Sequence, residues 1–308
     1  MGQGSRYKHV AVLMGGVSAE REISLRSGIA ASAGLRACGY EVTEVDLQDA
    51  CVHLPDGVEA VFLALHGTFG EDGAIQAQLD ALGVAYTGSG AAASRRAMDK
   101  AVSKAIWQEC GVPTAPFCVV SAGDPVVFDL PAVVKPVSQG SSIGVHLVQA
   151  CDELGPALAD AFQYDARVMV EAYIPGRELT VGILDGVALP VVEIVAPDGW
   201  YGFGAKYTTG QTRYEVPASL ADVDVAHLQA LALAAFNGLG CAGFGRVDFR
   251  LPPEGGAMAL EVNTIPGLTE TSLLPKAAAA AGISFAALCG RIMATAGMGR
   301  EAEGVVDA

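Results

Sequence analysis

The sequence has little positive charge, no paired-cysteine pattern and no long apolar run. Nineteen Lys and Arg residues stand against 34 Asp and Glu residues, which gives the 308-residue chain a formal net charge of −15. This charge argues against binding to DNA, RNA or an anionic membrane surface, because those partners attract basic proteins. It still allows a local basic pocket for a small phosphate ligand.

The seven cysteines form no recognisable framework, since their number is odd and no two have the CxxC spacing. We therefore expect reduced thiols rather than disulfides or a zinc site. The sequence also lacks a signal-peptide core and any run of the ~18 apolar residues that a membrane-spanning helix requires. These absences predict a soluble protein of the cytoplasm.

Apolar residues nevertheless make up 51% of the chain and charged residues only 17%, so more than one core can be buried. At roughly 100–200 residues per domain, the length predicts two or three domains. Residues 1–95 alternate between strand patterns at 8–14, 41–46, 60–65 and 84–86 and helix patterns at 19–37 and 73–82. This alternation predicts a doubly wound parallel α/β sheet.

The remainder of the chain has the pattern of an α+β fold. Its first part has a helix pattern over about 94–110, strands at 116–120, 131–136, 143–148 and 167–173, and a helix near 152–162. Its last part, from 179, has strand hairpins at 179–195, a long helix at 219–238, a hairpin formed by 243–250 and 257–263, and C-terminal helices.

Four polar residues on that last hairpin form a candidate metal site. Counting outward from the turn at 252–256 places Asp248 opposite Glu261 and Arg246 opposite Asn263, all on one face. Two opposed carboxylates destabilise a sheet unless a cation compensates, and Mg²⁺ prefers carboxylate, amide and phosphate oxygens. The alternative is a solvated charged face.

A second candidate is Lys135 with the Gly/Ser loop 138–142, whose backbone N–H groups could cover a polyphosphate. The loop lacks the GK[ST] of a Walker A motif, and a flexible hairpin loop is the alternative. Beyond it, Glu171 and Glu178 flank a turn and could accept from an amine and a ribose hydroxyl, although exposed Glu residues usually serve solubility.

Two residues of the N-terminal sheet are candidates for ligand contact at its carboxyl edge. Glu20 follows Gly15-Gly16 at the start of a helix, where complementing the helix dipole is the simpler role. His66 ends the third strand, where a structural role is the simpler one. The segment lacks GxGxxG, which disfavours a dinucleotide-dependent reductase. The aromatic loop 198–217 is typical of a lid, or of a surface insertion.

Taken in this order, the segments resemble the D-alanine–D-alanine ligase family of ATP-grasp enzymes, over nearly the whole chain. The stretches that carry the resemblance are GGVSAEREISLRSG (15–28), ALHGTFGEDGAIQ (64–76), YTGSG (86–90), AMDK (97–100), VKPVSQGSSIGV (134–145), GRVDF (245–249) and LEVNTIPGLTETSLLPKAA (260–278). Departures from the common family pattern are Gln139, Gly202 and Gly204, which bear on loop contacts rather than on the reaction.

The resemblance implies a three-domain ATP-grasp architecture, with an N-terminal substrate-binding domain (1–95), a central domain (96–178) and a C-terminal catalytic domain (179–308). It implies a homodimer that uses ATP, with two Mg²⁺ or Mn²⁺ ions, to join two D-alanine molecules through an acyl phosphate for peptidoglycan precursor synthesis. A related ligase with another second substrate, or a non-catalytic nucleotide-binding regulator, are the alternatives.

The resemblance also implies residue roles. The nucleotide phosphates would be contacted by Lys100, Lys135 and Lys206, and the loop that covers them would include Ser141 and Ser142. The adenine site would be lined by Glu171, Tyr173 and Ile174, and Glu178 would bind the ribose. Asp248, Glu261 and Asn263 would be metal ligands. Of the residues around the amino acids, Glu20 and His66 would contact the first D-alanine, and Ser272 and Leu273 would bind the carboxylate of the second. Arg246 and the Gly267 N–H would stabilise the tetrahedral intermediate. Glu20, Ser141 and Tyr207 would form a hydrogen-bonded trio.

Overall fold

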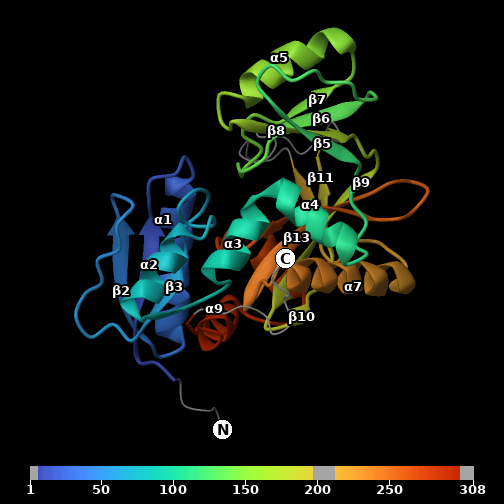
Figure 1. Ribbon diagram of the computed structural model, residues 1–308. Helices are drawn as coiled ribbons and strands as arrows, with labels where there is room; N and C mark the ends of the chain where they lie inside the picture. The colour runs from blue at the N-terminus through green and yellow to red at the C-terminus, as the bar shows by residue number, and fades with distance from the viewer. Residues whose placement is uncertain (1–5, 197–211, 299–308) are drawn as a thin grey trace.

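The computed structural model describes residues 6–196 and 212–298, which build three sheets (Figure 1). The N-terminal sheet is parallel, in the order β2-β1-β3-β4, with bounds β1 (His9–Gly15), β2 (Glu41–Leu47), β3 (Ala60–Leu63) and β4 (Ala85–Tyr86). Residues 10–13 are fully buried, as expected of a parallel strand covered on both faces. Helix α1 (Arg21–Ala37) packs on β1 and β2, and α2 (Ala74–Leu82) contacts β4. The predicted parallel sheet is confirmed.

The central sheet is antiparallel, in the order β5-β8-β6-β7. Its strands are β5 (Phe117–Ser121), β6 (Ala132–Pro136), β7 (His146–Val148) and β8 (Arg167–Ala172), and α5 (Cys151–Ala161) packs on β6 and β7. The strand expected from 143 begins only at His146, so the Gly/Ser loop between β6 and β7 is longer than predicted. This small sheet lies at the top of Figure 1, apart from the N-terminal sheet.

The third sheet is also antiparallel, in the order β12-β11-β9-β13-β14, with β10 paired to β9. Its strands are β9 (Arg177–Leu184), β10 (Val187–Ala188), β11 (Val192–Val195), β12 (Arg213–Glu215), β13 (Phe244–Leu251) and β14 (Met258–Asn263). Helix α7 (Asp222–Gly238) covers one face, where Leu228, Ala232 and Phe236 share a core with Val247 and Phe249. The other face of β13 is left for the side chains of alternate residues.

The single helix predicted over about 94–110 is wrong, because two helices occupy this stretch. Helix α3 (Ala91–Met98) ends at Asp99, and α4 (Lys100–Glu109) begins after it. The backbone of Asp99 is extended, and its side chain accepts hydrogen bonds from the N–H groups of Ala101 and Val102. An aspartate in this position is a strong N-cap, so it starts a new helix instead of continuing the old one.

The C-terminal helices return to the N-terminal sheet. Helix α8 (Leu273–Ala280) contacts β9, whereas α9 (Phe285–Ala294) packs on α1 (Figure 1). Leu288, Ile292 and Met293 of α9 belong to the same buried cluster as residues of β1 and β3, so the two ends of the chain share one core. Among the described residues, no single helix has the length and apolar character of a membrane span, and α8 and α9 reach them only together across a 104° bend.

Candidate active site

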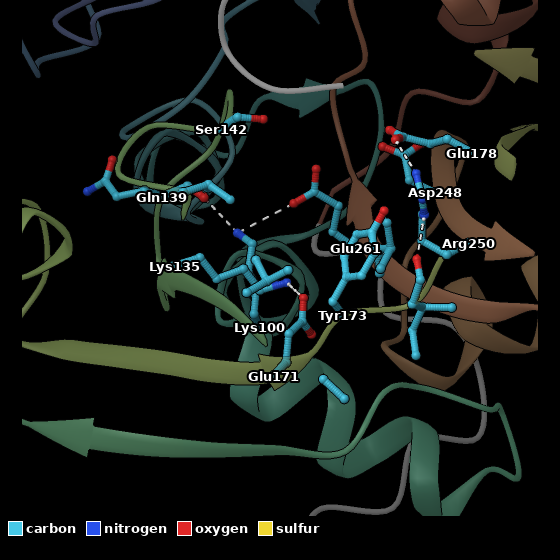
Figure 2. A pocket seen from close by; sticks show the side chains of 15 residues that line it. Lys100, Lys135, Gln139, Ser142, Glu171, Tyr173, Glu178, Asp248, Arg250 and Glu261 are labelled. Atoms are coloured by element: carbon cyan, nitrogen blue, oxygen red, sulfur yellow. Dashed lines mark hydrogen bonds and ion pairs between the residues drawn. The ribbon is translucent and has the colours of Figure 1, made fainter. Parts of the chain in front are cut away.

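A pocket opens between the central and C-terminal sheets, and both sheets contribute to its walls (Figure 2). The central sheet supplies Lys135 and Glu171, and the loop after β6 supplies Gln139 and Ser142. From the C-terminal sheet come Glu178, Asp248, Arg250, Leu260 and Glu261, and α4 contributes Lys100. Residues that the sequence assigned to the nucleotide and to the metal, from Lys100 to Glu261, thus line one pocket.

One end of the pocket carries two lysines. Lys100 Nζ lies 3.5 Å from a carboxylate oxygen of Glu261 and donates to the Gln139 backbone carbonyl at 2.6 Å. Lys135 Nζ donates to Glu171 at 2.5 Å. The Gln139 contact uses the main chain, so the departure from an acidic residue at this position does not remove it. Two ammonium groups at one end of a pocket favour an anionic ligand group there.

Glu171 is the centre of a buried charge cluster. Its second oxygen lies 2.8 Å from Nζ of Lys104, a residue of α4 whose side chain is 0% exposed. Burial by itself would raise the pKa of Glu171, but Lys135 and Lys104 outweigh it and hold that pKa below its usual value. Burial also lowers the pKa of Lys104 to about 8, against the opposing attraction of Glu171.

The other end of the pocket is organised by Arg250. Its Nε donates to the Ile174 carbonyl at 3.0 Å, and its Nη1 donates to Glu178 at 3.2 Å. Its guanidinium carbon lies 5.7 Å from the centre of the Tyr173 ring, within the range of a cation–π contact. Figure 2 shows this group on the side of the pocket away from Lys135 and Gln139.

The hairpin register predicted for β13 and β14 is confirmed. Arg246 pairs with Asn263, and Asp248 pairs with Glu261. The register then shifts by one residue after Asp248, so Leu260 has no directly opposed partner and forms a β-bulge. Because of the bulge, the consecutive residues Leu260 and Glu261 both line the pocket.

Asp248 is 7% exposed and fully hydrogen-bonded. Arg246 donates to it through Nε and Nη2, both at 2.8 Å, while Thr180 and the Asn263 amide donate at 2.5 and 3.0 Å. Asp248 and Glu261 line the pocket, and with the side-chain amide of Asn263, which is bonded to Asp248, they form an oxygen donor set that fits Mg²⁺ or Mn²⁺. No group of three His, Cys, Asp or Glu side chains gathers anywhere in 6–196 and 212–298, so further ligands would be water and substrate oxygens.

Glu20, which follows β1 of the N-terminal sheet, contacts the loop between β6 and β7. Ser141, in the loop after β6, donates a short hydrogen bond to a carboxylate oxygen of Glu20, which occupies the N-cap position of α1. Ser141 and Ser142 both have positive φ (52° and 57°), an uncommon conformation for residues with a side chain. Two members of the predicted trio are therefore in contact. The third, Tyr207, lies with Lys206 in 197–211, outside the described residues.

His66 is buried at the junction with the C-terminal segment. Its Nδ1–H donates to the Ile265 carbonyl at 2.9 Å, and Nε2 accepts from Ser27 at 3.0 Å. Ser27 in turn accepts from the Leu268 N–H. Burial lowers the pKa of His66 to about 4, so the ring is neutral at pH 7. Both ring nitrogens are thus used to hold the 265–268 segment against β3.

Glu71 reaches the same segment and was missed by sequence analysis. It accepts from the N–H groups of Gly67 and Ile265, at 2.8 and 3.2 Å. Burial, with the charge of Glu20 second, raises its pKa to about 8. Its place within the GEDG of 70–73 was a signal, because an acidic residue in a Gly-rich turn often accepts from backbone N–H groups.

Gly267, Ser272 and Leu273 follow the same segment. A Cβ built on Gly267 would lie 2.8 Å from Ser272 Oγ, so a side chain at position 267 would force the Ser272 hydroxyl to move. Ser272 Oγ accepts from the Thr269 N–H at 3.1 Å, and Leu273 begins α8 with 8% exposure. The structure therefore brings Gly267 and Ser272 together, beside the neutral His66.

Arg250 and Lys104 were also missed. Arg250 shares its strand face with Arg246 and Asp248, so the alternation that identified those two residues was a sufficient signal. For Lys104 there was none, since its partner Glu171 is 67 positions away on another element.

Two antiparallel sheets that face each other across a pocket, with lysines on one side and paired carboxylates on the other, define the ATP-grasp class of proteins. Comparison with known proteins narrows the class. Residues 49–89 match the model of the D-ala D-ala ligase N-terminus, and residues 106–294 match that of the C-terminus.

The chain is 50% identical to a D-alanine–D-alanine ligase from Methylacidiphilum infernorum over 286 residues, covering 93% of this chain and 94% of that protein. It is 48% identical to one from Syntrophotalea carbinolica, with 94% and 97% covered. A crystal structure of the Bacillus anthracis ligase in complex with ATP superposes with a TM-score of 0.83 at 34% identity, over 94% of this chain and 97% of that one. The chain belongs to the D-alanine–D-alanine ligase family.

Proposed function

We propose that this protein joins two D-alanine molecules into D-alanyl-D-alanine, with conversion of ATP to ADP and phosphate, as a step in peptidoglycan precursor synthesis. The observation that carries the proposal is the pair of carboxylates Asp248 and Glu261, which line one pocket with Lys100 while Arg246 is bonded to Asp248 beside them. A binding protein would need the lysines but not an arginine held beside a metal-type carboxylate pair.

In this proposal the nucleotide lies between the two sheets. Its phosphates meet Lys100, Lys135, Ser142 and the loop after β6, and its nucleoside end meets Glu171, Tyr173, Ile174 and Glu178. The polarity of the pocket supports this orientation, because the lysines lie at one end and the aromatic ring and Glu178 at the other. Lys206, in the segment outside the described residues, is proposed to reach the phosphates.

The first step transfers the γ-phosphoryl group to the carboxylate of the first D-alanine. The bond from the γ-phosphorus to the β–γ bridging oxygen breaks, a bond from that phosphorus to the carboxylate oxygen forms, and ADP leaves. Asp248, Glu261 and Asn263 would hold one or two Mg²⁺ ions, which when bound neutralise charge on the transferring group. Glu20 is proposed to hold the ammonium group of this D-alanine, with His66 fixing the segment beside it.

In the second step the neutral amine of the second D-alanine attacks the acyl phosphate carbon. Arg246 and the Gly267 N–H donate to the oxygen that gains negative charge, and phosphate leaves with the bonding electrons and takes up the proton that the amine loses. Ser272 and the N-terminus of α8 at Leu273 are proposed to bind the carboxylate of this substrate. Water would hydrolyse the acyl phosphate, so the Glu20–Ser141 contact and Tyr207 are proposed to close the site.

The proposal includes the organisation of the protein. We assign residues 1–95, 96–178 and 179–308 to three domains. We also propose that the protein is a homodimer and that it acts in the cytoplasm, where ATP is supplied. The three separate sheets support the division, although α3 and α4 pack with the C-terminal core. Light scattering after size-exclusion chromatography measures the assembly.

The function is tested by incubating the purified protein with ATP, Mg²⁺ and D-alanine. Phosphate release should depend on D-alanine, should be absent with L-alanine, and should equal the dipeptide formed, measured by mass spectrometry. Phosphate release without dipeptide, or equal rates with both enantiomers, would refute the assignment. A mixed product with a different amine or hydroxy acid would instead identify a ligase with another second substrate.

A further inference from the structure

Lys104 carries a buried charge that no step of the proposed mechanism uses. Its side chain on α4 is 0% exposed, and it does not line the pocket. Its Nζ lies 2.8 Å from one carboxylate oxygen of Glu171, while Lys135 Nζ donates to the other oxygen at 2.5 Å (Figure 2 shows this second contact). Glu171 thus has a lysine on each oxygen, and of these two lysines only Lys135 lines the pocket.

Glu171 and Lys104 are both charged at neutral pH. The two lysines hold the pKa of Glu171 below its usual value, so this residue is a carboxylate. Burial lowers the pKa of Lys104 to about 8, so at pH 7 about nine-tenths of the molecules still carry the ammonium group. The cluster of Lys104, Glu171 and Lys135 therefore has two positive charges and one negative charge.

The pocket wall itself has no surplus of positive charge for an anionic ligand. Among the described residues, its lining includes four carboxylates and three cationic side chains: Glu171, Glu178, Asp248, Glu261, Lys100, Lys135 and Arg250. Metal ions held by Asp248 and Glu261 would balance those two carboxylates but not Glu171, which neutralises Lys135. Lys104, behind the wall, supplies a second positive charge at this end of the pocket.

We propose that Lys104 is a positioning residue that acts through charge: it pairs with Glu171 on the buried side, so that the positive charge of Lys135 stays available to the phosphates of a nucleotide in the pocket. A charge acts over a distance, so Lys104 needs no contact with the nucleotide. The inference rests on the proposed function only for the identity of the anion. Binding of ADP requires no turnover, so the two can fail separately.

The test compares the binding of ADP and adenosine by calorimetry at one fixed Mg²⁺ concentration. The two ligands share the nucleoside, so the ratio of the adenosine Kd to the ADP Kd reports what the phosphates contribute. Lys104→Met should bind ADP ~10-fold more weakly than wild type and adenosine within about twofold of wild type. The control Lys276→Met removes the same charge from α8, outside the pocket lining, and should bind both ligands within about twofold of wild type.

A second replacement in the same chain restores the balance of charge. Lys104→Met leaves Glu171 to neutralise Lys135, and adding Glu171→Gln removes that carboxylate. The ratio of the two Kd values should then return to within about threefold of wild type. An effect of Glu171→Gln on the nucleoside end changes both Kd values and cancels in the ratio. If Lys104 served packing alone, the double variant would keep the ratio of Lys104→Met or fall below it.

Three results would overturn the proposal: an ADP affinity of Lys104→Met within twofold of wild type, equal losses for ADP and adenosine, or a double variant that does not recover the ratio. If Lys104→Met does not fold, Lys104→Gln takes its place. Glutamine keeps a polar group beside Glu171 and removes the charge, so the same loss of the ratio is expected.

Discussion

Replacement of Lys104 should lower the free energy of unfolding more at high pH than at neutral pH. The ammonium group is fully buried, bonded to Glu171, to Thr114 at 2.6 Å and to the Ala115 carbonyl at 3.3 Å. Thr114 continues the chain of contacts by donating to the Ala259 carbonyl of β14. Lys104 therefore links the central sheet to the bulged strand of the C-terminal sheet, and Lys104→Met removes this link.

The magnitude follows from the pKa of Lys104, about 8 in the folded protein against 10.5 in the unfolded chain. Because the folded pKa is lower, the unfolded chain binds more protons between pH 8 and 10.5, and stability rises with pH across that window. Between pH 7 and 9.5 the gain from this residue is about 2 kcal/mol. At pH 7 the cost of a buried charge offsets much of the lost ion pair, and Glu171 keeps Lys135 as a partner, so Lys104→Met should destabilise by only about 0–2 kcal/mol.

The assay is urea unfolding of wild type and Lys104→Met at pH 7 and 9.5, with Lys276→Met on α8 as control. The difference in unfolding free energy between wild type and Lys104→Met should grow by about 2 kcal/mol at the higher pH. Lys276→Met controls for the general loss of a lysine side chain, because Lys276 lies half-buried on α8 over the Tyr214 ring and outside the Glu171 cluster. A difference for Lys104→Met that stays constant or shrinks would refute the reasoning.

Three further replacements test other parts of the site. Asp248→Asn should lower turnover at least ~10-fold, about 1.4 kcal/mol of barrier, and raise the Mg²⁺ needed for half-maximal rate; near-wild-type turnover at limiting Mg²⁺ would reject the metal assignment. His66 is neutral when folded and has a pKa of about 4 against 6.5 in the unfolded chain, so wild type should lose about 2–3 kcal/mol more stability than His66→Gln between pH 7 and 4.5. Parallel pH profiles of unfolding would contradict this. For Glu71 the pH dependence of stability has the opposite sign. Its pKa is about 8 in the folded protein and 4.5 in the unfolded chain, so the wild type loses stability as the pH rises between these values. Relative to wild type, Glu71→Gln should gain about 3 kcal/mol from pH 5 to 8 in chemical unfolding, and no relative gain would show that Glu71 is ionised throughout.

Local sequence patterns predicted those parts of the molecule in which residues close together in the sequence are in contact. Alternation along a hairpin was enough to pair Asp248 with Glu261, and βα alternation was enough for the parallel sheet. The same alternation would have identified Arg250, which the β-bulge at Leu260 does not displace. The break between α3 and α4 was encoded by Asp99 but was hidden within an otherwise continuous helical pattern.

Other features depend on contacts between distant segments, which no local pattern encodes. The ion pair of Lys104 with Glu171 requires α4 to meet β8, and the hydrogen bonds of His66 require the 265–268 segment to return to β3. The resemblance to a family suggested that His66 meets substrate, whereas the structure places both of its nitrogens on protein atoms. A residue in a shared motif can therefore support the site without facing the ligand.

The acyl phosphate pathway, on which the proposed roles of the pocket residues depend, is tested most directly with D-alanine in which both carboxylate oxygens are ¹⁸O. Attack of a carboxylate oxygen on the γ-phosphorus leaves that oxygen in the phosphate released when the peptide bond forms. One ¹⁸O atom should appear in inorganic phosphate for each D-alanyl-D-alanine made, measured by mass spectrometry. Phosphate without ¹⁸O, or ¹⁸O recovered in AMP, would contradict the account.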